Sequence, residues 1–229
     1  EIQKKFGIGY SKSNYTSLYR YLKEKGYTTD IMLKSGLILK SKKGNSYYDR
    51  FTDRLMFPIF DVHGKVIAFG GRVLDNSQPK YLNSPETQIF EKNTTLYGLN
   101  YARVSRQKEV FIVEGYMDVI AMYQAGIKNV VATLGTAFTQ GHADLIKRYF
   151  NNVILLYDSD DAGVRAALRA IPILQSNDIK VRVLHLPDKQ DPDDYITKYG
   201  VESLKTLANN ADGAVAFQGK IIKQKYDIT

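Results

Sequence analysis

Residues 153–163 read VILLYDSDDAG, an unbroken apolar run that ends at two aspartates spaced two residues apart. The run is short and rich in branched side chains, which is typical of a strand buried on both faces of a parallel sheet. Alternate residues of an extended segment point the same way, so Asp158 and Asp160 can face one ion. Their mutual repulsion is costly unless a cation binds. The stretch therefore predicts an α/β fold with an acidic site at a strand end.

Helix capping is the structural alternative for these acids. Ser159 or Asp161 could cap the helix that follows, and a cap needs only one side chain. We therefore predict metal binding for Asp158 and Asp160, and capping or solvation for Asp161.

The same pattern extends in both directions from this stretch. We expect strands at 109–114, 129–133, 153–157 and 180–186, and helices near 116–125, 139–150, 161–175, 191–199 and 201–209. Short apolar strands that alternate with helices indicate a mostly parallel sheet covered by helices on both faces.

Carboxylates follow two more of these strands. Glu114 ends the first strand, Gly115 permits a sharp turn after it, and Asp118 falls in the first turn of the next helix. Asp191 and Asp193 follow the last strand after a short loop. The carboxyl ends of parallel strands meet at one crevice of an open sheet. Oxygen ligands without nitrogen or sulfur favour Mg²⁺ or Mn²⁺, and with them phosphate chemistry.

Helix-end roles compete with metal binding at some of these positions. The helix dipole alone favours a carboxylate at Asp118. Pro192 suits the first turn of a helix, with Asp191 as its N-cap. We therefore rank the predicted metal ligands with Glu114, Asp158 and Asp160 first, Asp191 and Asp193 next, and Asp118 last.

The loop at 134–139, LGTAFT, lies at another predicted strand exit. Gly135 would let backbone N–H groups approach a phosphate or the acidic residues. An ordinary strand-to-helix loop capped by Thr139 explains the same residues, and both interpretations stay open.

Charge is unevenly distributed along the chain. Residues 1–108 carry 19 Lys or Arg and 9 Asp or Glu, a net charge of +10, whereas residues 109–229 carry 13 and 15, a net charge of −2. This division suggests a polyanion held by the first part and metal ions held by the second, although a solvated basic surface would look the same. We expect one phosphate-contacting ridge built from Arg50, Arg54, Arg72, Lys80 and Lys92.

Residues 1–107 follow a different pattern and predict a smaller mixed α+β subdomain. We expect helices near 15–22 and 30–35, strands at 55–60 and 65–73, and a largely irregular connection over 74–95. Gly70 and Gly71 would permit a bulge or a close approach of another group.

Composition excludes several classes of site. Cysteine is absent, which removes disulfides, thiolate zinc sites and cysteine nucleophiles, and the spacing of the three histidines fits no metal site, so we expect no zinc. The chain has no run of 18 apolar residues and no signal peptide, so we expect a cytosolic protein that does not enter a membrane. The first residues look like the end of a helix, and we expect a fragment of a longer protein.

Taken in order, the motifs resemble the RNA-polymerase core of bacterial replicative primases of the DnaG type. The most specific combination is PKYLNSPET at 79–87 with VEGYMD at 113–118, followed by YDSD at 157–160 and DPD at 191–193. The Glu, the Asp-x-Asp and their strands are similar to the wider TOPRIM fold. The resemblance implies a TOPRIM-type, mostly parallel sheet flanked by helices over 108–200, after the α+β subdomain at 1–107 and before a C-terminal helical segment at 201–229.

The resemblance also implies an activity. It is the synthesis of short RNA primers from ribonucleoside triphosphates on a single-stranded DNA template, during replication in the bacterial cytoplasm. The expected mechanism is two-metal nucleotidyl transfer with Mg²⁺, for which Mn²⁺ can substitute. Glu114, Asp158 and Asp160 match the family's metal-binding acids, and Asp118, Asp191 and Asp193 match further acidic positions.

Basic residues match as well, with gaps. The nucleotide- and template-binding ridge of the family corresponds to Arg50, Arg72, Lys80, Asn83 and Lys92, and Lys5 falls where a basic residue is usual. Thr52 stands where relatives often carry another Arg. The family's zinc-binding and helicase-binding modules are missing, so contact with a replicative helicase would need a C-terminal module absent here.

Two other functions use the same features. One is a metal-dependent nuclease or topoisomerase fragment, which would cleave nucleic acid without nucleotides. The other is a non-catalytic, nucleotide-sensing or DNA-binding module, which would bind nucleotides after loss of metal and form no phosphodiester product.

Overall fold

The computed structural model of the chain describes residues 1–42, 44–187 and 190–226. Two units separate by their contacts, Glu1–Glu91 and Lys92–Thr229. This division falls before the expected boundary at residue 107, because residues 92–107 pack on the second unit. Tyr97 forms a β-bridge with Ala132, and Leu99 and Ala102 are buried.

The first unit is a mixed α+β unit, as expected. In its described part, an antiparallel sheet has the strand order β1 (Gly9–Ser11), β4 (Arg54–Phe60), β5 (Val66–Arg72) and β6 (Tyr81–Asn83). A separate antiparallel pair joins β2 (Ile38–Lys40) to β3 (Tyr47–Asp49). The helices are α1 (Ile2–Phe6), α2 (Ser17–Glu24) and α3 (Thr29–Lys34). The sequence predicted β4, β5 and the three helices, but not the short strands β1, β2, β3 and β6.

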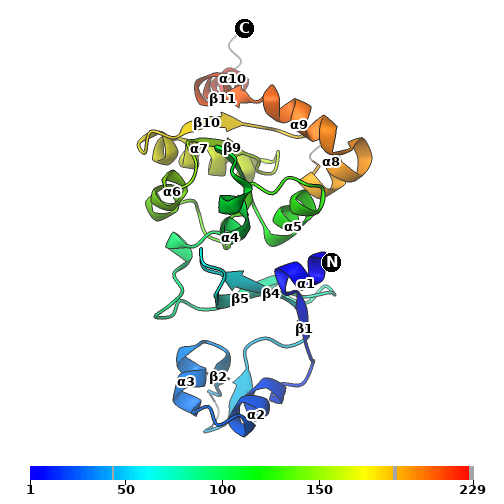
Figure 1. The fold of residues 1–229 in the computed structure, drawn as a ribbon, viewed down its shortest axis with the longest axis vertical. Coiled ribbons are helices and arrows are strands. Elements are labelled where there is room, and N and C mark those ends of the chain that lie inside the picture. Colours follow the sequence, from blue (N-terminus) through cyan, green and yellow to red (C-terminus); the bar gives the residue numbers. More distant parts are fainter. Residues whose placement is uncertain (43, 188–189, 227–229) are drawn as a thin grey trace. The chain divides into compact units, whose positions relative to one another are not determined.

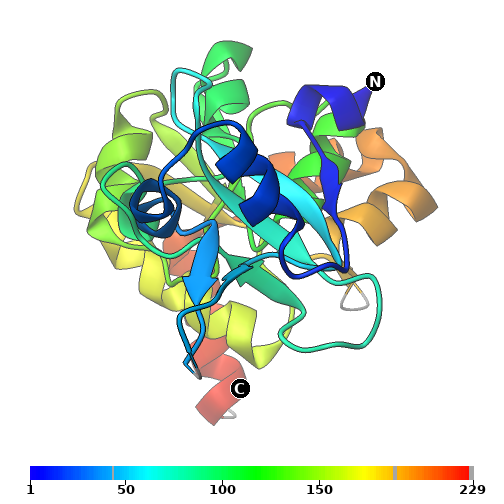
Figure 2. The same cartoon turned by 90° about the horizontal axis from the view of Figure 1, so that it is seen from below.

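The β4–β5 hairpin is set by its turn and its buried face (Figures 1 and 2). Asp61 accepts hydrogen bonds from the backbone N–H groups of His63 at 2.8 Å and Lys65 at 2.9 Å, which closes the turn. Phe57 and Ile59 are fully buried two residues apart on one face of β4.

The second unit contains the parallel sheet that the sequence predicted. Its described strands have the order β11 (Asp212–Gly213), β10 (Lys180–Val183), β9 (Asn152–Leu155), β7 (Glu109–Val113) and β8 (Val130–Ala132). Every pairing is parallel except that of β11 with β10. Both faces are buried, since Val110, Ile112, Val153 and Leu155 are fully inaccessible and Ile154 of the opposite face is too. This burial explains why the strands read as continuous apolar runs.

Helices connect and cover these strands. They are α4 (Leu99–Ala102), α5 (Tyr116–Gln124), α6 (Gln140–Lys147), α7 (Asp161–Gln175), α8 (Pro192–Tyr199), α9 (Val201–Asn209) and α10 (Ala214–Tyr226), with 3₁₀ turns η1 (Lys92–Thr94) and η2 (Arg103–Ser105). The predicted helix at 201–209 is confirmed by α9, whereas β11 and α10 were not predicted. Residues 227–229 of the expected segment 201–229 lie outside the described residues. Within the part of the chain that is described, no helix has the length and apolar content needed to cross a lipid bilayer.

Strand order creates one special position in this sheet. From β7 the chain crosses through α5 to β8 on one side, then returns through α6 to β9 on the other side of β7 and continues through α7 to β10. Accordingly α5 packs with α8 and α6 packs with α7, on opposite sides of the sheet (Figure 1). The connection after β7 therefore crosses the sheet in one direction and the connection after β9 crosses it in the other. In α/β sheets, ligands bind in the crevice outside the carboxyl ends of strands at such a point.

Candidate functional site

Glu114 and Asp158 lie at this switch point, one residue beyond β7 and three residues beyond β9. The backbone N–H of Asp158 donates a hydrogen bond to Oε1 of Glu114 at 3.1 Å, which joins the two strand ends. Desolvation raises the pKa of Glu114, the Asp158 N–H opposes this, and the charges of Asp158 and Asp160 raise the pKa further. The first-ranked acids are therefore neighbours, as their places in the sequence predicted.

Asp118 belongs to the same group of charges. It lies in the first turn of α5, where its Oδ2 accepts a hydrogen bond from the N–H of Gly115 at 3.0 Å. Burial raises the pKa of Asp118 to about 7 against that hydrogen bond, and the charges of Asp191, Asp158 and Glu114 act in the same direction as burial. The helix-end role that the sequence indicated is present, and it brings this carboxylate into the acidic group.

Asp160 performs the capping that was expected of Ser159 or Asp161. Its Oδ1 accepts a hydrogen bond from the N–H of Gly163 at 2.8 Å at the start of α7. Ser159 instead donates to the carbonyl oxygen of Leu186 at 3.0 Å, so its hydroxyl is turned away from the helix. Asp161 does not cap α7 but is exposed to solvent, which is the other role predicted for it, while the second oxygen of Asp160 has no hydrogen-bond partner among the described residues.

Gly163 has a role that the sequence pattern did not reveal. A Cβ atom at this position would lie 2.0 Å from the carbonyl oxygen of Asp158, closer than real atoms approach. Only glycine lets the first turn of α7 sit this close to the acidic loop. The signal in the sequence is the glycine two residues after Asp161, although the sequence alone does not show which group approaches that glycine.

Asp191 caps α8, as Pro192 at the next position indicated. Its Oδ1 accepts a hydrogen bond from the N–H of Asp194 at 2.8 Å. Its charge also raises the pKa values of Asp118 and Asp158, so it lies within electrostatic reach of the strand-end acids. Asp193, in the first turn of α8, is exposed and is not among the charges that shift those pKa values.

The acidic group consists of Glu114, Asp118, Asp158, Asp160 and Asp191. In the part of the chain that the structure describes, none of them forms an ion pair with Lys or Arg, although ion pairs occur elsewhere in the same unit. Neighbouring carboxylates help to raise the pKa values of Glu114, Asp118 and Asp158, and acids crowded in this way without a cationic partner favour binding of a hard cation with oxygen ligands. The chemistry of the donor set therefore fits a divalent metal.

The group is not arranged as a finished cage. Among residues 1–42, 44–187 and 190–226, no three Asp, Glu or His side chains are placed to hold one ion together. Asp118, Asp160 and Asp191 each use one oxygen on a helix N–H. This arrangement is compatible with Mg²⁺, which usually keeps several waters and takes one or two carboxylates.

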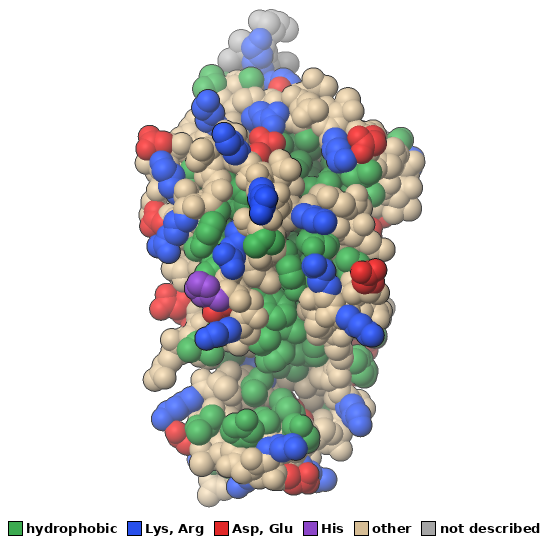
Figure 3. Space-filling model, in the orientation of Figure 1, with side chains coloured by type: hydrophobic (Ala, Val, Ile, Leu, Met, Phe, Trp, Pro, Cys, Tyr) green, Lys and Arg blue, Asp and Glu red, His purple; other side chains and the backbone are tan. Residues whose placement is uncertain are grey.

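Some of the predicted basic residues make contacts within the fold and others are exposed to solvent. In the first unit, Arg50 donates from Nη2 to the carbonyl oxygen of Asn83 at 3.0 Å, and desolvation lowers the pKa of Arg50. Arg72, at the end of β5, stacks over the ring of Tyr81 at 5.6 Å from its centre, and Lys80 is exposed just before β6. Lys and Arg side chains are spread over the face drawn in Figure 3 and form no single continuous patch there.

Arg54 does not lie on the expected ridge. Arg54 is 7% exposed and donates from Nη1 to the carbonyl oxygen of Pro79 at 2.9 Å, so it is a structural residue and the expectation that it lies on the ridge was wrong. Gly71 makes this possible, because a Cβ there would be 3.0 Å from Cδ of Arg54. Lys5 is exposed on α1.

Lys92 belongs to the second unit, where His142 holds its backbone. The ring of His142 is fully buried, with Nε2 donating to the carbonyl oxygen of Lys92 at 2.7 Å and Nδ1 accepting from the N–H of Thr139 at 3.1 Å. Thr139 Oγ1 donates to the carbonyl oxygen of Asn93 at 2.6 Å. The sequence alone does not predict this role of His142. The signal was its spacing three residues after Thr139, the N-cap of α6.

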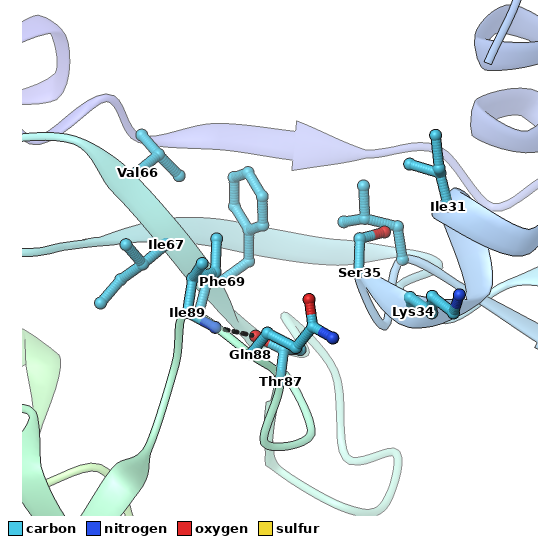
Figure 4. Close-up of a pocket in the computed structure, with 11 residues that line it drawn as sticks. Ile31, Lys34, Ser35, Val66, Ile67, Phe69, Thr87, Gln88 and Ile89 are labelled. Atoms are coloured by element: carbon cyan, nitrogen blue, oxygen red, sulfur yellow. Dashed lines mark hydrogen bonds between the residues drawn. The ribbon is translucent and has the colours of Figure 1, made fainter. Parts of the chain in front are cut away.

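The first unit also contains a mostly apolar hollow of about 380 Å³ (Figure 4). Ile31 and Lys34 of α3, Val66 and Phe69 of β5, and Ile89 line it. Its lining contains no carboxylate, so it has no part in the acidic site.

Comparisons with known proteins agree with this geometry. The family model described as DNA primase catalytic core, N-terminal domain, matches residues 1–103, and the Toprim-like model matches residues 111–196. A DNA primase from Clostridium acetobutylicum is 47% identical over 219 residues, which cover 95% of this chain and 36% of that protein. A DNA primase from Synechococcus elongatus is 42% identical over 212 residues, which cover 89% of this chain and 30% of that protein. The chain thus spans about a third of the length of the curated relatives it matches.

Solved structures give the same result. A DNA primase domain from Pseudomonas aeruginosa superposes with a TM-score of 0.90 at 39% identity, over 99% of this chain and 73% of that chain. A DnaG primase catalytic domain bound to single-stranded DNA superposes with a TM-score of 0.88 at 38% identity, over 98% of this chain and 71% of that chain. The chain therefore belongs to the bacterial DnaG-type DNA primase family, and it contains the Toprim domain of that family's catalytic core.

Proposed function

We propose that this chain carries out nucleotidyl transfer in the synthesis of short RNA primers on single-stranded DNA. The observation that carries the proposal is the group of five carboxylates at the sheet's switch point, which has no ion-pair partner in the described part of the chain. The family supports this reaction in preference to the nuclease and the non-catalytic alternatives.

A divalent metal is implied by the Toprim domain, and we propose Mg²⁺, with Mn²⁺ as a substitute. Asp158 and Asp160 would hold it together with bound waters, and Glu114 would be a further ligand or the proton acceptor. When bound, the metal stabilises charge on the attacking and leaving oxygens of phosphoryl transfer. Asp118 and Asp191 would act from one step away, as further negative charges beside the strand-end acids.

Side chains of the protein would accept the proton and orient the triphosphate. Glu114 lies at the mouth of the switch point, where it would accept the proton of the attacking 3′-hydroxyl or serve as a ligand. Arg72, Lys80 and Lys92 would orient the incoming triphosphate. Arg72 is already held against Tyr81, so little conformational freedom is lost when it contacts a phosphate.

Template binding would rest on the first unit, which carries 15 Lys or Arg and 9 Asp or Glu over residues 1–91, a net charge of +6. Arg50 donates from Nε and Nη2 to the carbonyl oxygen of Asn83, and its Nη1 has no partner among the described residues and could contact a phosphate. Contacts of this kind release counterions, so DNA affinity should fall steeply with rising salt.

The test is primer synthesis by the chain on single-stranded DNA with ribonucleoside triphosphates and either Mg²⁺ or Mn²⁺. Glu114→Ala and Asp158→Ala should abolish the product, whereas Asp161→Asn, which changes an exposed carboxylate in the first turn of α7, should not. Full activity in both alanine variants would contradict the assignment. Cleavage of the DNA without nucleotides would favour the nuclease, and nucleotide binding with no product would favour the non-catalytic module.

A further inference from the structure

We propose that the loop between β8 and α6, together with α7, forms a separate binding site for a phosphate group, and that its occupant is the pyrophosphate released by nucleotidyl transfer. The choice of occupant rests on the proposed function. The site itself is argued from a cavity, its hydrogen-bond donors and its charges, all within the second unit.

The cavity has a volume of about 290 Å³. Its walls are Thr133 at the end of β8, the loop residues 135–138, Tyr157 after β9, and Arg169 of α7, with Glu114 at one side. This volume lies at the lower end of the range for ligand pockets, about 300–1,000 Å³, and is ample for a small anion.

The α7 wall leaves room for a ligand and ends in a cation. Ala162, Ala166 and Arg169 line the cavity from one face of the helix, since their spacing follows the helical repeat. Arg169 is exposed and forms no ion pair or hydrogen bond in the described part of the chain. A guanidinium presents a planar fork of donors that matches phosphate oxygens.

Hydroxyl groups in the same cavity are also without partners. Thr133 lines the cavity, and its hydroxyl oxygen is accessible there without a hydrogen-bond partner among the described residues. The hydroxyl oxygen of Thr136 is buried and likewise unpaired. Buried polar groups are nearly always satisfied, and an unsatisfied one costs about 1–3 kcal/mol, so the buried Thr136 hydroxyl indicates a missing ligand.

The loop backbone adds further donors. The N–H groups of residues 135–138 have no acceptor in the part of the chain that is described, and Gly135 adopts a φ of 70° that turns the chain here. Thr139 does cap α6, so one interpretation of the sequence is confirmed, but the cap uses none of the four preceding N–H groups. A guanidinium, two hydroxyls and a run of amides form a set dominated by donors, which is the complement of a phosphate.

The charge of Glu114 determines which kind of phosphate compound the cavity can bind. Its carboxylate repels a bare anion, so a divalent cation that neutralises Glu114 should strengthen binding. The same carboxylate belongs to the acidic group, so a phosphate in this cavity would lie next to the proposed site of reaction. The leaving pyrophosphate meets both conditions, being small and formed at that site.

The experiment is isothermal titration of the chain with inorganic pyrophosphate, with and without Mg²⁺. We expect Arg169→Gln to weaken binding about tenfold or more, and Thr133→Val about threefold. Arg165→Gln is the matched control, because Arg165 is exposed on α7 and does not line the cavity. The Arg165→Gln variant should bind pyrophosphate with the affinity of the parent chain. Unchanged thermal unfolding of Arg169→Gln would confirm that the loss is local.

Two results would overturn the proposal. Equal affinity in the parent chain and Arg169→Gln would remove the site. Loss of nucleoside triphosphate binding as large as the loss of pyrophosphate binding would assign the cavity to the incoming nucleotide and reject the product. The titration uses no template and no turnover, so failure of primer synthesis would leave this result intact.

Discussion

The acids of the second unit and the cations of the first unit differ in how much they contribute to the stability of the fold. Arg54 is buried on the Pro79 carbonyl, and Arg50 donates to Asn83. Glu114 and Asp158 are exposed at strand ends and have no cationic partner in the described part of the chain. The basic residues are thus partly structural, whereas the acids are held together against their own repulsion.

This difference teaches where function is concentrated. A charged residue that satisfies backbone groups explains itself through stability, as Arg54 does. Helix capping accounts for one oxygen each of Asp118, Asp160 and Asp191, but not for the crowding of these charges around Glu114 and Asp158, which we attribute to a ligand or reaction. Substitutions should therefore separate the two regions by whether they change stability or activity.

The largest effect is expected at the acids. Asp158→Asn should lower primer synthesis by about 10²–10³-fold, the cost of removing one electrostatic contact to a transition state. In metal-free buffer the same change should leave the free energy of unfolding unchanged or raise it, because it removes repulsion with Asp160 and Asp191. Enzyme assays and chemical denaturation check both parts. A marked loss of stability would show that Asp158 is structural.

The next effect is expected at the buried cation. Arg54→Met should lower the free energy of unfolding by about 2–3 kcal/mol, because it leaves the Pro79 carbonyl without its charged donor. Arg72→Gln is the matched surface change. It should alter stability by less than about 1 kcal/mol and make the salt dependence of single-stranded DNA affinity shallower by about 0.7 in slope. Similar stability losses in both variants would erase the distinction.

A smaller change in stability should distinguish the capping hydrogen bond of Asp191 from the effect of its negative charge. Asp191→Ala should cost about 1 kcal/mol, since the N–H of Asp194 loses its acceptor. Asp191→Asn keeps the acceptor and removes the repulsion with Asp118, so it should be neutral or stabilising. Thermal unfolding of the two variants is the measurement. Equal destabilisation by both would show that the negative charge itself stabilises the fold.

The smallest effect is a pH dependence at His142. Burial lowers the pKa of His142 below its ordinary value of 6.5, against the hydrogen bonds to Lys92 and Thr95. The unfolded chain therefore takes up a proton below pH 6.5 that the folded chain does not, so stability falls with pH there by at most about 1.4 kcal/mol per unit. The pH dependence should be shallower in His142→Gln between pH 6.5 and 5.5. Identical slopes would mean that the folded ring is protonated as readily as the unfolded one.

The sequence predicted the sheet because its strands are buried on both faces. Val153 to Leu155 read as one apolar run, and the helices between strands end at recognisable glycines such as Gly126 and Gly200. The short strands β1, β2 and β6 could not be predicted in this way. Each has three residues and is half-exposed, so its pairing partner rather than its own pattern defines it.

The candidate site was predictable where chemistry follows strand ends, and not where it depends on contacts distant in sequence. Glu114 and Asp158 lie 44 residues apart, yet their positions after parallel strands predicted that they would meet. The burial of Arg54 on Pro79 and the clamp of His142 on Lys92 are tertiary contacts without a local pattern. Composition likewise gave no reason to separate Arg54 from Arg72.

The most direct test is the location of Mn²⁺ in crystals of the chain, found by anomalous scattering, in the parent and in Asp158→Asn. We predict an anomalous peak outside the carboxyl ends of β7 and β9, within ligand distance of Glu114 or Asp158, and a weakened or absent peak in the variant. An ion bound elsewhere in both crystals, with the strand-end acids free of metal, would contradict the assignment of this acidic group as the metal site.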